Sequence, residues 1–163
     1  MRPEIFWVAN ETPGKLAVMP RPRGGDWLED EIKALQDCGV NVLVSLLTAD
    51  EASELELSDE KKFCDQSGIE LISFPINDRN IPSSSDECSG LIRTLDARLS
   101  NASNVAVHCR MGIGRSAMIV AALIVQQGVT VEEAFMRIST SRGFDVPDTQ
   151  EQFDWVAQLS QDL

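Results

Sequence analysis

The run RSAMIVAALIVQQG at residues 115–128 constrains the fold more than any other part of this sequence. Its composition favours a helix, but the helix is apolar on all sides and is stable only when other elements surround it. Short apolar runs typical of buried strands precede it at residues 41–47, 69–75 and 104–107. A central helix next to such strands predicts a domain with a substantial hydrophobic core.

Predicted strands and helices alternate along the whole chain. Two more strand-like runs lie near the amino end, and six further segments have helical patterns: strands at 5–9 and 15–20, helices after 26 and at 48–57, 58–68, 83–101, 130–143 and 146–160. This alternation predicts an α/β fold with a single twisted, mainly parallel sheet flanked by helices. Because no repeat, low-complexity tract or long linker divides the 163 residues, we expect a single domain over 1–163.

Local signals give further structural expectations. Asp26 is predicted to cap the first helix, and Thr130, with Glu133 three residues later, to cap the helix at 130–143. We expect the tryptophans to pack in the core or between helices, and the cysteines outside the motif described below to be small buried hydrophobic residues. These residues are Trp7, Trp27, Trp155, Cys38, Cys64 and Cys88.

Charge and cysteine spacing exclude several classes of function. The chain has 14 Lys and Arg against 26 Asp and Glu, a net charge of −12 that disfavours nucleic acid and anionic membrane partners. No apolar window reaches the roughly 18 residues of a membrane span, and the amino terminus does not resemble a secretion signal. The four cysteines lack CxxC spacing, so we expect a cytoplasmic protein with no metal and no cofactor.

Residues 105–118, VAVHCRMGIGRSAM, join a predicted buried strand to the central helix. Helix amino ends bind anions because their unpaired N–H groups carry partial positive charge. Gly112 and Gly114 allow a tight loop that turns further N–H groups inward. We therefore expect the loop to encircle a phosphate, and its predicted binding residues are Arg110, Met111, Gly112, Ile113, Gly114 and Arg115.

Cys109 lies at the base of this loop, next to His108, the only histidine of the chain. The loop N–H groups, the helix dipole and Arg115 all favour a thiolate, which is nucleophilic at neutral pH. Arg115 carries a planar fork that can bind two phosphate oxygens. The Ser116 hydroxyl can stabilise the thiolate when it leaves again.

The motif HCRMGIGRS, with five residues between cysteine and arginine, resembles the signature of the protein tyrosine phosphatase superfamily. The size of the chain and its strand–helix order are similar to the compact dual-specificity branch over nearly the whole length. One departure is Ala117, where many members carry glycine. The resemblance implies that Cys109 attacks phosphorus, that Arg115 binds the equatorial oxygens, and that His108 orients the loop and helps to keep Cys109 ionised. A core histidine bonded to the backbone is the ordinary alternative for His108.

The family also requires an aspartic acid on a separate loop upstream of the cysteine. The segment FPINDRNIP, residues 74–82, supplies Asp78 after a predicted strand. Taken alone, the NDRN composition is that of an ordinary turn. The resemblance implies that Asp78 protonates the leaving oxygen. Arg79, Arg110 and Arg115 cluster around the two motifs, and we expect them to give an acidic protein a basic mouth.

The segment VPDTQEQFDWV at residues 146–156 is similar to the family's glutamine segment, which holds the hydrolytic water. Thr149 and Gln152 have the matching spacing. Gln150 is the alternative, and glutamines on exposed helices are usually only solvated side chains. The resemblance therefore implies a water-positioning role for Gln152.

Other functions fit parts of the motif. GIGRSA satisfies the dinucleotide-binding pattern G-x-G-x-x-A, but that fold needs a parallel strand where residues 130–143 are predicted to be helical. A rhodanese-like sulfurtransferase also ends a cysteine loop with arginine, but leaves the acid loop unexplained. A pseudophosphatase that binds phosphate without turnover is the third alternative, and the intact Cys109, Arg115 and Asp78 argue against it.

These observations predict a phosphomonoesterase that forms a cysteinyl-phosphate intermediate. Its expected substrate is a phosphorylated protein or peptide, or another small phosphomonoester. The chain has no tyrosine and no recognisable counterpart of the classical tyrosine-specific loop, which favours a shallow site. Inositol phosphates are disfavoured because Arg110 is the only basic residue among the variable positions of the loop. The oligomeric state and the choice among phosphotyrosine, phosphoserine and phosphothreonine stay open.

Overall fold

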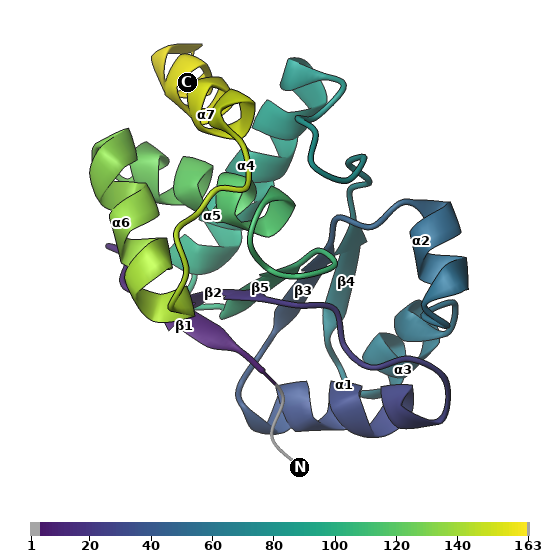
Figure 1. Ribbon diagram of the computed structural model, residues 1–163. Helices are drawn as coiled ribbons and strands as arrows, with labels where there is room; N and C mark the ends of the chain where they lie inside the picture. The colour runs from purple at the N-terminus through teal and green to yellow at the C-terminus, as the bar shows by residue number, and fades with distance from the viewer. Residues whose placement is uncertain (1–3, 163) are drawn as a thin grey trace.

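The computed structural model describes residues 4–162 and has a five-stranded sheet with helices on both faces (Figure 1). The strands are β1 (Phe6–Val8), β2 (Leu16–Met19), β3 (Val42–Ser45), β4 (Glu70–Ser73) and β5 (Val105–His108), in the order β1-β2-β5-β3-β4. β1 is antiparallel to β2, and every other neighbouring pair is parallel. The predicted α/β fold with a mainly parallel sheet is confirmed.

The helices form where the sequence predicts them. They are α1 (Leu28–Asp37), preceded by the 3-10 turn η1 (Gly25–Trp27), and α2 (Ala49–Glu54), α3 (Glu60–Gln66), α4 (Ser85–Ser100), α5 (Arg115–Gln126), α6 (Val131–Arg142) and α7 (Gln150–Asp162). Thr130 caps α6 as predicted, because its hydroxyl accepts the Glu133 N–H at 3.2 Å. None of the helices within residues 4–162 is long and apolar enough to span a membrane.

A hydrophobic core lies on each face of the sheet, because alternate side chains of a strand point to opposite sides. Val42 and Val44 pack with residues of α4–α7, whereas Leu43 packs with residues of α1 and α3. Helix α5 is buried at every position from Arg115 to Ile124. The predicted central helix is therefore confirmed.

Three local predictions are wrong. Asp26 does not cap α1, because it lies within the 3-10 turn and Trp27 occupies the N-cap position without a side-chain cap. Trp27 is 54% exposed and stacks with the Arg23 guanidinium, 4.6 Å from its ring centroid. Cys38 is exposed beyond the end of α1, whereas Cys64 and Cys88 are buried as expected. Burial raises the pKa of each of these two buried thiols to about 12.

The topology brings several loops to one edge of the sheet. β5 lies between β2 and β3, and the three strands are parallel, so their carboxyl ends meet. The segments that follow these strands and β4 therefore lie near each other (Figure 1). In open parallel sheets, ligands bind at this edge.

Candidate active site

The loop between β5 and α5 wraps around the sulfur atom of Cys109. The Gly112 N–H donates to Cys109 Sγ at 3.3 Å, and the Ser116 Oγ lies 3.3 Å from the same sulfur. Gly112 has a φ of +74°, and a Cβ there would lie 2.8 Å from the Met19 carbonyl carbon. Only glycine fits this position without a backbone shift. Cys109 itself is 2% exposed, so the thiol lies at the base of the loop as predicted.

Several hydrogen-bond donors around Cys109 have no acceptor. Within residues 4–162, none of the backbone N–H groups of Met111, Ile113, Gly114 and Arg115 donates to a protein atom. The Arg115 Nε is buried and also lacks a partner among these residues. Gly114 is the N-cap of α5 and provides no side-chain cap. Unpaired donors at a helix amino end, together with a guanidinium N–H, form a site suited to a tetrahedral oxyanion.

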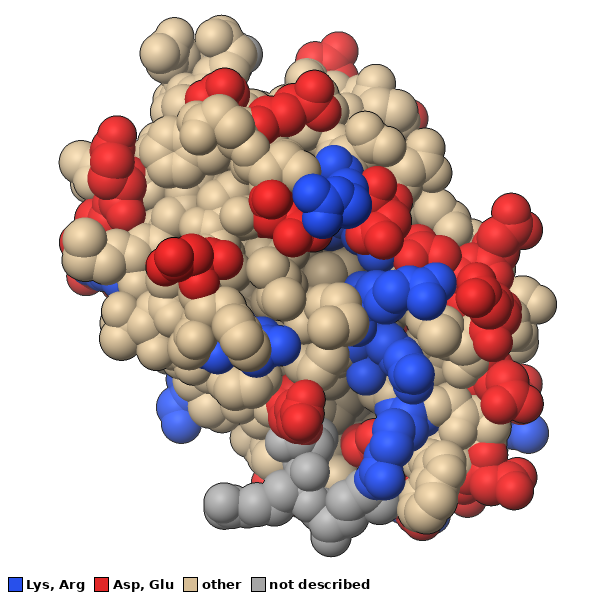
Figure 2. Space-filling model, viewed as in Figure 1, with Lys and Arg blue, Asp and Glu red and all other residues tan. Residues whose placement is uncertain are grey.

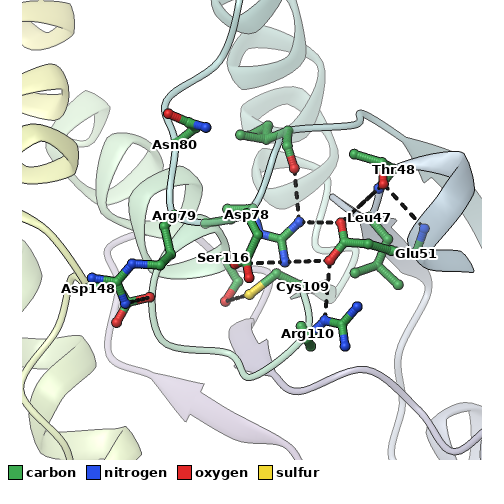
Figure 3. Close-up of polar contacts among 12 residues, drawn as sticks. Leu47, Thr48, Glu51, Asp78, Arg79, Asn80, Cys109, Arg110, Ser116 and Asp148 are labelled. Atoms are coloured by element: carbon green, nitrogen blue, oxygen red, sulfur yellow. Dashed lines mark hydrogen bonds and ion pairs between the residues drawn. The ribbon is translucent and has the colours of Figure 1, made fainter. Parts of the chain in front are cut away.

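Arg115 is 1% exposed, and a carboxylate holds its guanidinium in place (Figure 3). Its Nη1 and Nη2 donate to the two carboxylate oxygens of Glu51 at 2.7 and 3.0 Å, and Nη1 also donates to the Ile76 carbonyl at 2.9 Å. These bonds occupy the outer end of the guanidinium and leave Nε free. Arg115 is thereby fixed without losing the donor nearest the helix.

Glu51 is a site residue that the sequence did not reveal. Burial alone would raise its pKa, but hydrogen bonds from Arg115 and the Thr48 N–H, with the charge of Arg115, lower the pKa to about 2. Thr48 and Glu51 also form the capping box of α2. The T-x-x-E pattern at residues 48–51 is visible in the sequence and marks a helix start, but it gives no sign of the contact with Arg115, 64 positions away.

Asp78 is a second carboxylate that contacts the Arg115 guanidinium. Its Oδ1 is 3.2 Å from Arg115 Nη2, and its side chain is 57% exposed. The structure therefore brings the predicted acid and the predicted nucleophile together. The pocket has a volume of about 300 Å³, and its lining residues are Asp78, Arg79, Cys109, Met111, Ile113, Gly114, Arg115 and Asp148.

His108 is buried beneath the loop and is paired with a second carboxylate that the sequence did not reveal. Its Nε2 lies 2.7 Å from Glu60 Oε2, and its Nδ1 faces the Cys109 carbonyl at 3.4 Å. Glu60 belongs to α3 and is 5% exposed. The contact with the Cys109 carbonyl fits a core histidine bonded to the backbone, and it equally fits a histidine that orients the loop. The Glu60 contact anchors the ring.

Gln152 lies at the loop, and Gln150 does not. A Cβ added to Gly114 would meet the Gln152 amide at 3.1 and 3.2 Å, which shows how near this amide lies. Gln152 is buried, donates from Nε2 to the Asn80 carbonyl at 3.1 Å and has its N–H bonded to the Thr149 hydroxyl. Gln150 bonds to Asp154 on the exposed side of α7.

The expected basic mouth is only partly correct, because each of its arginines faces a carboxylate. Arg79 lies 3.5 Å from Asp148, and Arg110 contacts Glu51 and Glu54. Figure 2 shows a column of basic side chains on this face with acidic side chains beside it. The local charge is therefore balanced in the pocket, and the unpaired N–H donors provide its preference for anions.

The fold is that of the protein tyrosine phosphatase superfamily in its compact, dual-specificity form. Residues 17–129 match the sequence profile of the family described as "Polymorphic toxin system, DSP-PTPase phosphatase". The match covers more than half of the chain, so the protein belongs to this family. The resemblance inferred from the cysteine motif is confirmed. The dinucleotide-binding alternative is wrong, since α5 leads into helix α6 rather than a strand.

Individual relatives are more distant. Human cyclin-dependent kinase inhibitor 3 is 24% identical over 138 residues, which are 83% of this chain and 65% of that protein. A crystal structure of kinase associated phosphatase, with serine replacing its catalytic-site cysteine, has a TM-score of 0.91 at 20% identity and covers 100% of this chain and 97% of its own. PTPMT1 in complex with PI(5)P has a TM-score of 0.77 at 19% identity, with 96% of each chain covered. At such identities, the structural matches establish the shared fold.

Proposed function

We propose that this protein is a cysteine-dependent phosphomonoester hydrolase of the protein tyrosine and dual-specificity type, with residues 1–163 acting as one catalytic domain. The observation that carries the proposal is the set of unpaired donors around Cys109, formed by the loop N–H groups and the buried Arg115 Nε. This set is complementary to three equatorial phosphate oxygens. Cys109 Sγ lies at the base of the same loop, from which we propose that it attacks phosphorus.

In the first half of the proposed reaction, the Cys109 thiolate attacks phosphorus and the bond to the leaving oxygen breaks. The loop N–H groups and Arg115 stabilise the charge that develops on the equatorial oxygens. Phosphate competes with the Asp78 carboxylate for Arg115 Nη2, which lies 3.2 Å from Asp78 in this structure. Protonated Asp78 then donates its proton to the departing alkoxide or phenoxide.

In the second half, water attacks the cysteinyl phosphate, the S–P bond breaks and the Asp78 carboxylate takes the water proton. Ser116, 3.3 Å from Cys109 Sγ, stabilises the thiolate as it leaves. The buried Gln152 amide beside Gly114 supports a role in orienting the water. His108, anchored by Glu60, fixes the start of the loop through the Cys109 carbonyl.

A phosphorylated peptide or protein is the substrate class that we propose. The exposed Asp78 and Met111 line the pocket of about 300 Å³ together with Cys109, so a phosphorylated residue can enter it from the surface. PTPMT1 has been crystallised with PI(5)P, but in this chain Arg110 is the sole basic side chain between Cys109 and Arg115, and it is paired with Glu51. A reducing, cytoplasmic setting fits an active thiol.

Turnover of p-nitrophenyl phosphate tests this function and separates it from a pseudophosphatase. We expect turnover by the wild-type protein, no turnover by C109S, and retained vanadate binding by C109S because the loop donors remain. C38S is the matched control, since Cys38 is exposed and outside the site. Binding of vanadate by a wild-type protein that turns over no phosphomonoester would establish the pseudophosphatase instead.

A further inference from the structure

A line of arginines leads away from the active-site loop on an otherwise acidic protein. Met19 at the end of β2 pairs with His108 at the end of β5, and beyond these strands the Arg21 N–H donates to the Arg110 carbonyl at 3.2 Å. Arg23 follows two residues later. We call Arg21, Arg23 and Arg110 the arginine ridge. Arg23 is exposed, and Arg21 and Arg110 are partly buried.

Two prolines restrict the backbone of the ridge and favour an extended conformation. Pro20 and Pro22 flank Arg21 in the sequence PRPR, fix φ at their own positions and have no N–H to add to a sheet. In an extended chain, residues two apart are separated by about 6–7 Å. An extended peptide has the same spacing between its alternate side chains, so Arg21 and Arg23 match two side chains on one face of such a peptide.

A mostly buried carboxylate holds Arg23 and leaves part of its guanidinium free. Arg23 is 46% exposed, and its Nε bonds to Glu31, which is only 8% exposed; the other face of the guanidinium stacks on Trp27. Both Nη groups of Arg23 therefore stay available. Arg21 has no ion pair with a carboxylate among residues 4–162. Arg21 and Arg23 line a cavity of about 400 Å³, and Glu4 and Glu31 line it as well.

We propose that the arginine ridge binds acidic side chains, either carboxylates or a second phosphate, next to the phosphorylated residue of a peptide substrate. The proposal rests on the proposed phosphatase function and specifies its substrate class. A peptide fits better than a membrane, because the ridge is narrow and the protein carries a net charge of −12. A flat anionic surface would meet many of the acidic side chains around the ridge, whereas an extended peptide can follow Arg21 and Arg23 within the cavity that they line and meets only Glu4 and Glu31 there.

The test compares kcat/KM for phosphotyrosine peptides that differ only in their flanking residues. One peptide carries Glu at alternate positions on the amino side, one carries them on the carboxyl side, and the third carries Ser. We expect the wild-type protein to prefer one acidic peptide over the Ser peptide by roughly three- to tenfold at low salt, with the preference shrinking as salt rises. If kcat/KM for each acidic peptide is about equal to kcat/KM for the Ser peptide, the proposal is overturned.

Arg21 is the informative position for substitution, because R23S would leave the mostly buried Glu31 without its partner. We expect R21S to lower the acidic-to-Ser ratio and R21E to reverse it, while R93S, a change at an exposed arginine on α4, keeps the wild-type ratio. An unchanged ratio in R21E overturns the proposal. A second experiment measures sedimentation of the protein with phosphatidylserine vesicles. If the wild-type protein binds the vesicles and R21E does not, the ridge binds a membrane and the proposal of a peptide ligand is overturned.

Turnover of p-nitrophenyl phosphate distinguishes the failure of this inference from the failure of the proposed function. That substrate is too small to reach the ridge. A protein that hydrolyses it but shows no preference among the peptides is a phosphatase without this subsite. A protein that does not hydrolyse it fails the proposed function itself.

Discussion

Replacing Glu51 by glutamine removes the charge that holds Arg115, and the structure gives the size of the effect. Hydrogen bonds from Arg115 and Thr48 outweigh burial and lower the Glu51 pKa from 4.5 to about 2. At about 1.36 kcal/mol for each pH unit, this corresponds to about 3 kcal/mol of folding free energy at pH 7. Breaking a buried ion pair typically costs about 3–5 kcal/mol, which agrees in size. We therefore expect E51Q to be destabilised by about 3 kcal/mol at pH 7.

The sign of the pH dependence follows from the lowered pKa. Stabilisation by ionised Glu51 is complete above its unfolded pKa of 4.5 and is lost as the pH falls toward 2. Urea unfolding followed by tryptophan fluorescence at pH 7 and pH 3 measures the difference between wild type and E51Q. We expect less than half of the difference in unfolding free energy found at pH 7 to remain at pH 3. The exposed Glu54, 3.5 Å from Arg110, provides the control E54Q, with an expected change below about 0.5 kcal/mol. An equal loss at both pH values would refute the reasoning.

Three further substitutions test the other parts of the site. R115K should lower kcat/KM by about two orders of magnitude, because an ammonium group cannot make the bidentate contact of a guanidinium with phosphate. A nearly unchanged kcat/KM would mean that another group binds the phosphate. D78A should slow phosphopeptides by about a hundredfold but slow p-nitrophenyl phosphate much less, and an equal loss for both leaving groups would remove Asp78 as the acid. G112A should lose most activity, because its Cβ would meet backbone atoms at 2.8 and 2.9 Å. The control G128A has a φ of +99° but no atom within 4 Å of its Cβ, so retained activity there separates the clash from backbone strain.

The sequence predicts features that depend on neighbouring residues and fails on those set by distant contacts. The loop around Cys109 and the buried α5 follow from a local pattern of glycines and apolar residues. Glu51 and Glu60 are separated from Arg115 and His108 by 64 and 48 positions, and both look like ordinary surface acids in the sequence. Their roles arise only when parallel strands bring α2 and α3 to the edge of the sheet.

Residues at helix ends show the same limit. Trp27 and Cys38 flank α1 and are hydrophobic by type, but the core beneath α1 is already filled by Leu28, Ile32 and Leu35. Hydrophobicity alone therefore placed them wrongly. Gln150 and Gln152 differ by two positions on α7, and a helix turns by about 200° over that interval. Only the docking of α7 on the loop determines that Gln152 lies inside and Gln150 outside.

Identification of the residue that carries phosphate during turnover tests the proposed mechanism most directly. The wild-type protein is mixed with p-nitrophenyl phosphate, quenched rapidly during the reaction and mapped by peptide mass spectrometry, with C38S as the control. We predict one added phosphoryl group on Cys109 in both proteins, formed together with a burst of nitrophenol. Turnover with no phosphorylated Cys109, or with the phosphoryl group on another residue, would contradict the account.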